Sequence, residues 1–252
     1  MEGVKFVGDK ILLPSDRSGY TKLYIYNMNG QLQRTIGDGN YDITSVYGYD
    51  PKTGDVYYQA AALGATDRQV YVTHKNGKTV RLTDREGWNT AFFSGDFQYF
   101  VNTWSDYNTP YVFTTRTREG KLINTIEDNK AVKQLVSDYG FCKREPFSFT
   151  TSEGVVLNGW MVKPKDFDAN KKYPVIMHQY SGPGSQQVTN SWSAGSMGQG
   201  GAFDSYLAQE GFIVVSVDGR GTGGRGSEFE KCTYLNLGNL ESKDQVETNL
   251  RS

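Results

Sequence analysis

The sequence predicts an all-β first half built from repeated four-stranded units, followed by the beginning of an α/β domain. Three observations lead to this fold class. Short strands of alternating polarity recur at a regular spacing up to about residue 128, and a stretch with helical spacing of its apolar residues follows them. A strand, a helix and a second strand then come in the order that an α/β sheet requires.

The first half contains three segments of similar sequence. Each ends in a hairpin of two alternating strands, and the turn glycines of these hairpins, Gly30, Gly77 and Gly120, stand 47 and 43 residues apart. This period is close to the ~40–50 residues of a four-stranded propeller blade. We therefore predict that residues 1–128 form about three blades of a β-propeller, fewer than the ~4–8 that close a ring. An ordinary antiparallel sandwich is the alternative, because it also has short strands at regular spacing.

Tight turns are predicted between the strands of each segment. Asn29-Gly30 and Asn76-Gly77 indicate type I′ hairpin turns, because both central residues of such a turn need a positive φ. A second hairpin lies upstream of the first in each segment, for example at Val56–Tyr58 after the Pro51–Gly54 turn. Each segment is therefore expected to have about four strands.

The pattern changes after Asp128. Residues 129–146 are predicted to form a connector with a helix at Lys130–Val136, and residues 147–252 to form the N-terminal part of an α/β domain. The expected elements of this third part are a hairpin at Phe147–Thr151 and Val155–Val162, a strand that ends near Met177, a helix at Phe203–Glu210 capped by Gly211, and a buried strand at Phe212–Val217.

Composition excludes several classes of function. The chain has 27 basic and 28 acidic residues and a net charge of -1, so it has no field that would attract nucleic acid or an anionic membrane. Its apolar runs are far shorter than the ~20 residues of a membrane helix. The first residues have no signal-peptide pattern, which for an internal fragment says nothing about the parent protein. Cys142 and Cys232 lack metal-site spacing and are interpreted as free thiols. With His74 and His178 as the only histidines, we expect no metal site and no cofactor.

Two motifs in the second half carry the functional prediction. The strand near Met177 leads into Tyr180-Ser-Gly-Pro-Gly-Ser185, and 33 residues after Ser185 comes Asp218-Gly-Arg-Gly-Thr-Gly-Gly-Arg-Gly226. In this order and spacing they resemble the prolyl oligopeptidase family of serine peptidases, and within it the dipeptidyl peptidase type. The resemblance extends to Lys172-Tyr-Pro174, Leu237-Gly238 and Glu241-x-x-Asp244-Gln245. It implies that residues 147–252 are the first part of an α/β-hydrolase catalytic domain, and the propeller repeats suit the N-terminal domain of the same family.

Tyr180 is the candidate catalytic residue. In α/β-hydrolases the loop after the third strand supplies a donor to the oxyanion hole, and the resemblance implies that the Tyr180 hydroxyl has this role. Acylaminoacyl peptidases of the family tend to have a His-Gly-Gly-Pro run there, so the tyrosine favours the dipeptidyl type. Without the resemblance, Tyr180 would be interpreted as only an amphipathic residue at a strand end, with its ring packed and its hydroxyl in water.

Other residues near this loop are interpreted as structural. His178 precedes any nucleophile, whereas the triad of this fold runs Ser, Asp, His, so His178 is predicted to be a strand residue and not the base. Asp218 could be a catalytic acid, and the glycines up to Gly226 could hold phosphate. No Lys-Ser/Thr follows these glycines, and the run is not expected to open a helix. We therefore predict a tight, hydrogen-bonded turn that supports the site, formed by Asp218 and Arg220 together with Gly182 and Pro183 of the first loop.

The resemblance implies the activity of a larger parent protein. That parent is expected to be a serine exopeptidase, an aminopeptidase that releases dipeptides with Pro or Ala in second position by acyl transfer. Its substrates would be peptides with a free N-terminus, it would be a homodimer, and it would be exported to the periplasm or the cell surface. No G-x-S-x-G sequence occurs in the 252 residues, so the triad is absent and the chain alone is expected to be inactive. The alternatives are an acylaminoacyl peptidase or esterase, and a binding homologue that has lost its triad.

Overall fold

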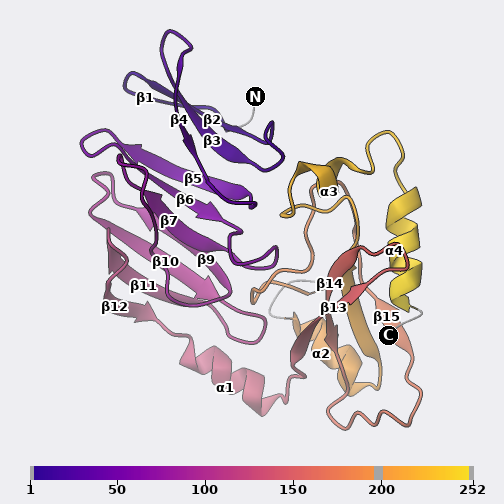
Figure 1. Ribbon diagram of the computed structural model, residues 1–252. Helices are drawn as coiled ribbons and strands as arrows, with labels where there is room; N and C mark the ends of the chain where they lie inside the picture. Colours follow the sequence, from indigo (N-terminus) through magenta and orange to yellow (C-terminus); the bar gives the residue numbers. More distant parts are fainter. Residues whose placement is uncertain (1–2, 196–200, 250–252) are drawn as a thin grey trace. The chain divides into compact units, whose positions relative to one another are not determined.

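The computed structural model describes residues 3–195 and 201–249 (Figure 1). The chain divides into two compact units, which do not follow one simple break in the sequence. The first unit contains residues 1–104, 112–127 and 224–228, and the second contains residues 105–111, 128–223 and 229–252.

The described residues of the first unit form three four-stranded antiparallel sheets, and in each of them the strands are paired in sequence order. The first sheet consists of β1 (Lys5–Val7), β2 (Lys10–Ser15), β3 (Lys22–Asn27) and β4 (Leu32–Ile36). The second consists of β5 (Ile43–Asp50), β6 (Asp55–Ala60), β7 (Gln69–Thr73) and β8 (Thr79–Arg81). The third consists of β9 (Trp88–Phe93), β10 (Tyr99–Ser105), β11 (Val112–Thr117) and β12 (Leu122–Glu127). These sheets confirm the predicted propeller blades.

Strand β6 of the second sheet is buried along its whole length, so its side chains pack on both faces of the sheet, since successive side chains of a strand point to opposite sides. Val56, Tyr58 and Ala60 of β6 pack in one core cluster with residues of the first sheet, such as Leu23. Tyr57 lies in another cluster, with Phe100 of the third sheet. Alternate side chains of β6 thus contact the first sheet and the third sheet, and join all three sheets into one unit.

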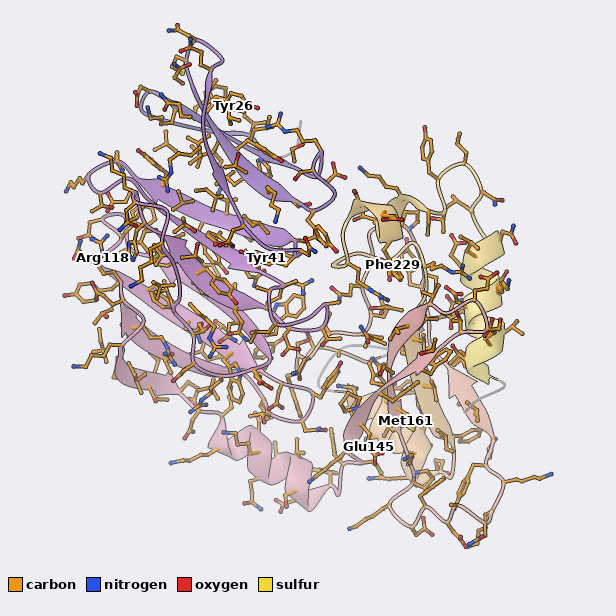
Figure 2. All side chains as sticks on the ribbon, in the orientation of Figure 1. Tyr26, Tyr41, Arg118, Glu145, Met161 and Phe229 are labelled. Carbon is orange, nitrogen blue, oxygen red and sulfur yellow. The ribbon has the colours of Figure 1, made fainter. Side chains whose placement is uncertain are left out.

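A buried charge cluster adds to this packing. The guanidinium of Arg118, in the turn between β11 and β12 (Figure 2), donates through Nη2 to the Tyr57 hydroxyl at 2.9 Å. The same nitrogen lies 3.2 Å from an oxygen of Asp55 and 3.5 Å from an oxygen of Asp50. The pair of carboxylates compensates the charge of an arginine whose side chain is only 19% exposed.

The hairpin turns differ from the type I′ prediction. Gly30 has a φ of 75°, but Asn29 is not among the residues with positive φ. The Gly30 N–H donates to Asn27 O and the Asn27 N–H donates to Gln31 O, which is typical of a turn that closes with one left-handed glycine. The Asn27 side chain favours this wider loop, because its Oδ1 accepts the N–H groups of both Asn29 and Gln31. The hairpins at Gly77 and Gly120 have the same pattern of backbone hydrogen bonds.

Among the described residues, the second unit contains a mixed sheet and three helices, and a fourth helix, α3 (Ser227–Lys231), lies at the boundary of the two units in the sequence. The sheet has the order β13 (Arg144–Thr150), β14 (Val156–Val162), β16 (Ile213–Asp218) and β15 (Val175–Met177), and only β15 and β16 are parallel. The other helices are α1 (Lys130–Asp138), α2 (Ala202–Gln209) and α4 (Asn239–Asn249). α2 lies between β15 and β16 in the chain and forms the crossover that a parallel pair needs. This part confirms the predicted beginning of a hydrolase domain.

β13 begins at Arg144, inside the stretch predicted as connector, so Pro146 is a strand residue. A proline is tolerated here because β13 is the edge strand of its sheet. β16 is buried along its whole length. Its Val214 packs with Trp160 in one cluster, and Val215 and Val217 pack in another cluster on the opposite side of the strand. Because β15 and β16 are parallel, their carboxyl ends bring the two predicted motifs to the same edge of the sheet.

Candidate active site

Tyr180 lies in the loop that leaves the carboxyl end of β15. The strand pairing continues to His178, whose N–H donates to Val215 O at 2.8 Å, and the chain then turns away from the sheet. The Tyr180 side chain is 69% exposed, and its hydroxyl makes no hydrogen bond with any residue in the described part of the chain. This hydroxyl is therefore available to a ligand as a donor.

The backbone next to Tyr180 is unusual. Ser181 has a φ of 53°, in the left-handed region that few residues other than glycine adopt. After this turn the Tyr180 ring folds back over the next peptide, so a Cβ built on Gly182 would lie 2.5 Å from Cε1 of the ring. Gly182 is thus the residue that leaves space for the ring.

Backbone hydrogen bonds connect the Tyr180 loop to the glycine-rich segment after β16. The Gly184 N–H donates to Gly221 O at 3.0 Å, and the Gly223 N–H donates to Ser185 O at 2.9 Å. The structure therefore places the two motifs side by side, although 33 residues separate Ser185 from Asp218.

Asp218 holds the far end of the same loop. Its carboxylate accepts the N–H groups of Gln187 and Val188, each at 2.9 Å, and the residue is only 7% exposed. Hydrogen bonds to an ionised carboxylate are stronger than those between neutral groups. Pro183, between Tyr180 and this anchor, is exposed and lines an apolar cavity of about 560 Å³ together with residues 230, 231, 233–235 and 237.

Arg220 is fully engaged with acidic side chains. Its backbone N–H and its Nη2 both donate to the Asp244 carboxylate at 2.7 Å, and Nη1 lies 2.7 Å from an oxygen of Glu153. Asp244, on α4, is completely buried. The hydrogen bonds that Arg220 donates to Asp244 raise the pKa of Arg220 above its usual range, so the guanidinium stays charged. Each of its three side-chain nitrogens already has an acidic partner among the described residues.

The glycine-rich segment does not have the geometry of a phosphate-binding loop. The prediction that no helix follows it is wrong, because α3 begins at Ser227, directly after Gly226. That short helix was missed because its five residues carry no long apolar period. Four consecutive amides of the segment nevertheless donate to other protein groups, those of Arg220, Gly221, Thr222 and Gly223. They are therefore not available to cradle a phosphate.

His178 lies half-buried beside the loop. Its Nε2 is 3.3 Å from Oε1 of Gln187, the residue whose N–H is bound by Asp218. This hydrogen bond is local to the loop, and the geometry places no serine hydroxyl against His178 among the described hydrogen bonds.

Sequence reasoning missed two side chains at this site, Ser181 and Gln245. The Gln245 amide donates to Ser181 Oγ at 3.2 Å and to Val217 O at 3.0 Å. For Gln245, the sequence offered only two adjacent polar residues on a helix, Asp244-Gln245. The neighbouring sequence does not indicate that side chains of this helix reach the ends of the strands.

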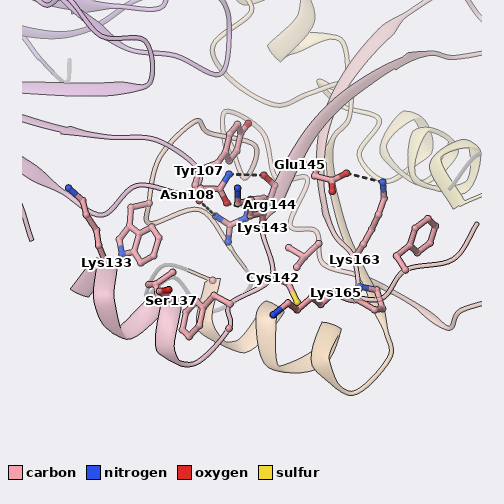
Figure 3. Close-up of a pocket in the computed structure, with 18 residues that line it drawn as sticks. Tyr107, Asn108, Lys133, Ser137, Cys142, Lys143, Arg144, Glu145, Lys163 and Lys165 are labelled. Carbon is pink, nitrogen blue, oxygen red and sulfur yellow. Dashed lines mark hydrogen bonds and ion pairs between the residues drawn. The ribbon is translucent and has the colours of Figure 1, made fainter. Parts of the chain in front are cut away.

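A larger hollow, of about 670 Å³, lies elsewhere in the second unit, and Tyr180 is not among its lining residues (Figure 3). Four lysines line it, together with an ion pair of 2.8 Å between Lys163 and Glu145. Cys142 also lines it, and both cysteines are free, as predicted. Within residues 3–195 and 201–249, no cluster of acidic, histidine and cysteine side chains could hold a metal, and no helix is long and apolar enough to cross a membrane.

Two family models match separate parts of the chain. Residues 3–111 match the family model of the dipeptidyl peptidase IV N-terminal region, and residues 203–249 match that of the prolyl oligopeptidase family. The crystal structure of Porphyromonas gingivalis dipeptidyl peptidase 4 superposes with a TM-score of 0.90 and 38% sequence identity over 99% of this chain. The chain belongs to the prolyl oligopeptidase family.

Relatives in this family are much longer than the chain. Dipeptidyl peptidase 4 of Arthroderma otae is 31% identical over 240 residues, which are 92% of this chain and 30% of the relative. Dipeptidyl peptidase 4 of Trichophyton rubrum is 30% identical over 239 residues, with the same coverage of 92% and 30%. The chain also covers 35% of the P. gingivalis structure. It therefore spans about a third of the length of these prolyl oligopeptidase family members.

Proposed function

We propose that the complete protein is a serine exopeptidase that releases dipeptides from peptides with a free N-terminus, with Pro or Ala in second position. The family assignment and the names of the relatives support a dipeptidyl peptidase. The observation that carries the proposal is the Tyr180 hydroxyl, which is exposed and without a partner in the described residues, on a loop anchored at the carboxyl end of a parallel strand.

The proposed reaction is acyl transfer. A serine attacks the scissile carbonyl, a histidine moves the proton to the leaving amine, and negative charge develops on the carbonyl oxygen. Tyr180 supplies a hydrogen bond to that oxygen, and an already oriented donor is most effective because it needs no reorganisation during the reaction. Gly182, Pro183, Asp218 and Arg220 act indirectly, since they shape and anchor the loop that presents Tyr180.

The 252 residues by themselves are expected to be inactive. They contain no G-x-S-x-G sequence, and an oxyanion donor without a nucleophile forms no acyl-enzyme. Hydrolysis of a peptide anilide by the purified chain, sensitive to Tyr180→Phe, would contradict this. From the resemblance alone we further propose that the complete protein is a homodimer and is exported to the periplasm or the cell surface.

The test is hydrolysis of two anilides by the complete protein, Gly-Pro anilide with a free amino group and the same compound acetylated. Cleavage of the free form alone is the expected result. Cleavage of only the acetylated form would identify an acylaminoacyl peptidase, and cleavage of neither would favour a binding homologue without a triad. Fold alone does not separate these three, because one fold hosts many functions.

A further inference from the structure

Gln245 connects helix α4 to the Tyr180 loop. Its Nε2 donates to Val217 O at 3.0 Å and to Ser181 Oγ at 3.2 Å. Val217 O is a carbonyl and only accepts, so the nitrogen of the amide must be on this side and the orientation of the amide group is determined. Val217 precedes Asp218 at the end of β16, and Ser181 follows Tyr180. One side chain thus connects both motifs.

The oxygen of the Gln245 amide lacks a hydrogen-bond donor among the described residues. Its Oε1 is buried and has no hydrogen-bond partner among the described residues. A buried carbonyl without a donor is unfavourable, and an apolar side chain of similar size would avoid this cost. Packing therefore does not explain why an amide is present at this position. Its two donated hydrogen bonds, in contrast, connect α4 to Val217 and to Ser181.

The hydrogen bond to Ser181 acts on a residue with an unfavourable backbone conformation. Left-handed backbone is unfavourable for a residue with a Cβ, and Ser181 has a φ of 53°. This residue sets the direction of the chain between Tyr180 and Gly182, and so brings the Tyr180 ring over the Gly182 peptide. The hydrogen bond from Gln245 to Ser181 Oγ stabilises this conformation from the side chain.

We propose that Gln245 is a positioning residue for Tyr180, which holds Ser181 in its left-handed conformation and thereby orients the tyrosine hydroxyl. The inference rests on the proposed function of Tyr180 as oxyanion donor. It assigns no contact with substrate to Gln245 itself. Small displacements of a catalytic group cost large factors in rate, so loss of this hydrogen bond is expected to affect turnover more than binding.

The first test is kinetic and uses the complete protein with Gly-Pro anilide. Gln245→Leu is expected to lower kcat by roughly 10-fold to 100-fold with little change in KM. In a Tyr180→Phe background the same substitution is expected to cause no further loss, because there is no hydroxyl left to orient; additive losses would overturn the proposal. The control is Gln209→Leu, since the Gln209 Nε2 also donates to two backbone carbonyls, at 2.9 and 3.0 Å, but at the end of α2.

The second test does not depend on activity. The protein is labelled with 3-fluorotyrosine, and the ¹⁹F resonance of Tyr180 is identified as the one that disappears in Tyr180→Phe. This resonance is expected to move in Gln245→Leu, and also in Gln245→Glu, which keeps the shape but cannot donate, while it stays in place in Gln209→Leu. An unchanged resonance in folded Gln245 variants would refute the positioning role. A moved resonance in a protein that cleaves neither anilide would instead refute the proposed function and leave the positioning intact.

Discussion

Tyr180 exposes its hydroxyl while its ring is held by the loop, and this combination makes the residue testable. Tyr180→Phe in the complete protein removes one oxyanion donor and keeps the ring, so we expect kcat to fall by ~10²–10³-fold with little change in KM. Steady-state kinetics on Gly-Pro anilide measure both. Tyr139→Phe is the matched control, because Tyr139 is 71% exposed at the end of α1. Equal kcat values for the two variants would exclude the role.

Gly182 controls the same ring from the next position. In Gly182→Ala the new methyl group would collide with Cε1 of Tyr180, so the ring must move and kcat is expected to fall by about 10-fold or more. Gly182 has no positive φ, so the substitution acts through this collision and not through backbone strain. Gly95→Ala is the control, since a Cβ there meets nothing within 4 Å. Wild-type turnover in Gly182→Ala would show that the ring position is unimportant.

At the scale of secondary-structure elements, the three hairpin glycines look alike but have different surroundings. Gly30 and Gly120 both have positive φ, at 75° and 88°, so alanine at either costs about 1–2 kcal/mol from backbone strain. At Gly30 the new Cβ meets nothing within 4 Å, whereas at Gly120 it would overlap the backbone carbonyl of Leu82. We expect Gly120→Ala to lower the urea midpoint of unfolding clearly more than Gly30→Ala. Similar midpoints would mean that the two neighbouring sheets can separate at this turn without cost.

The anchor of the Tyr180 loop is a second prediction at this scale. Asp218→Ala leaves the N–H groups of Gln187 and Val188 without their acceptor, so we expect a loss of about 2–4 kcal/mol in the free energy of unfolding. Asp218→Asn keeps an acceptor and should lose less. Thermal melts compare both with Asp166→Ala, whose exposed side chain makes no hydrogen bond in the described part of the chain and should stay within ~0.5 kcal/mol. Equal melting temperatures for the two alanine variants would show that the carboxylate is not an anchor.

At the scale of the molecule, each unit exposes large apolar side chains. The first unit exposes Leu122, Ile123 and Ile126 of β12, each at 50% or more, and the second exposes Leu235 at 88% on the loop before α4. Large exposed apolar side chains favour association in solution. We expect the isolated 252-residue chain to elute from size-exclusion chromatography as oligomers, and Ile123→Lys with Leu235→Lys to reduce them. A single monomeric peak from the unmodified chain would contradict this expectation.

Much of the architecture was predictable because its signals are local. Alternating side chains predict strands such as β6 wherever the chain is extended, and the apolar spacing of Lys130–Val136 predicts the helix α1. The order of the Tyr180 and Asp218 motifs along the sequence indicated the family that the comparisons support. Positive φ at Gly30 and Gly77 was also predicted and is confirmed, whereas the predicted type I′ turn is wrong because Asn29 and Asn76 are not left-handed.

The succession of elements and the motif that carries Tyr180 can therefore be predicted from the amino-acid sequence, since both depend on neighbouring residues. Which side chains come into contact depends on the tertiary structure. It brings Gln245 to Ser181 across 64 positions and Val188 to Asp218 across 30, and it places Tyr107, from the β10–β11 connection, in the core of the second unit with Trp160. Such contacts depend on how whole strands and helices pack, and any short polar segment has many possible partners until that packing is complete.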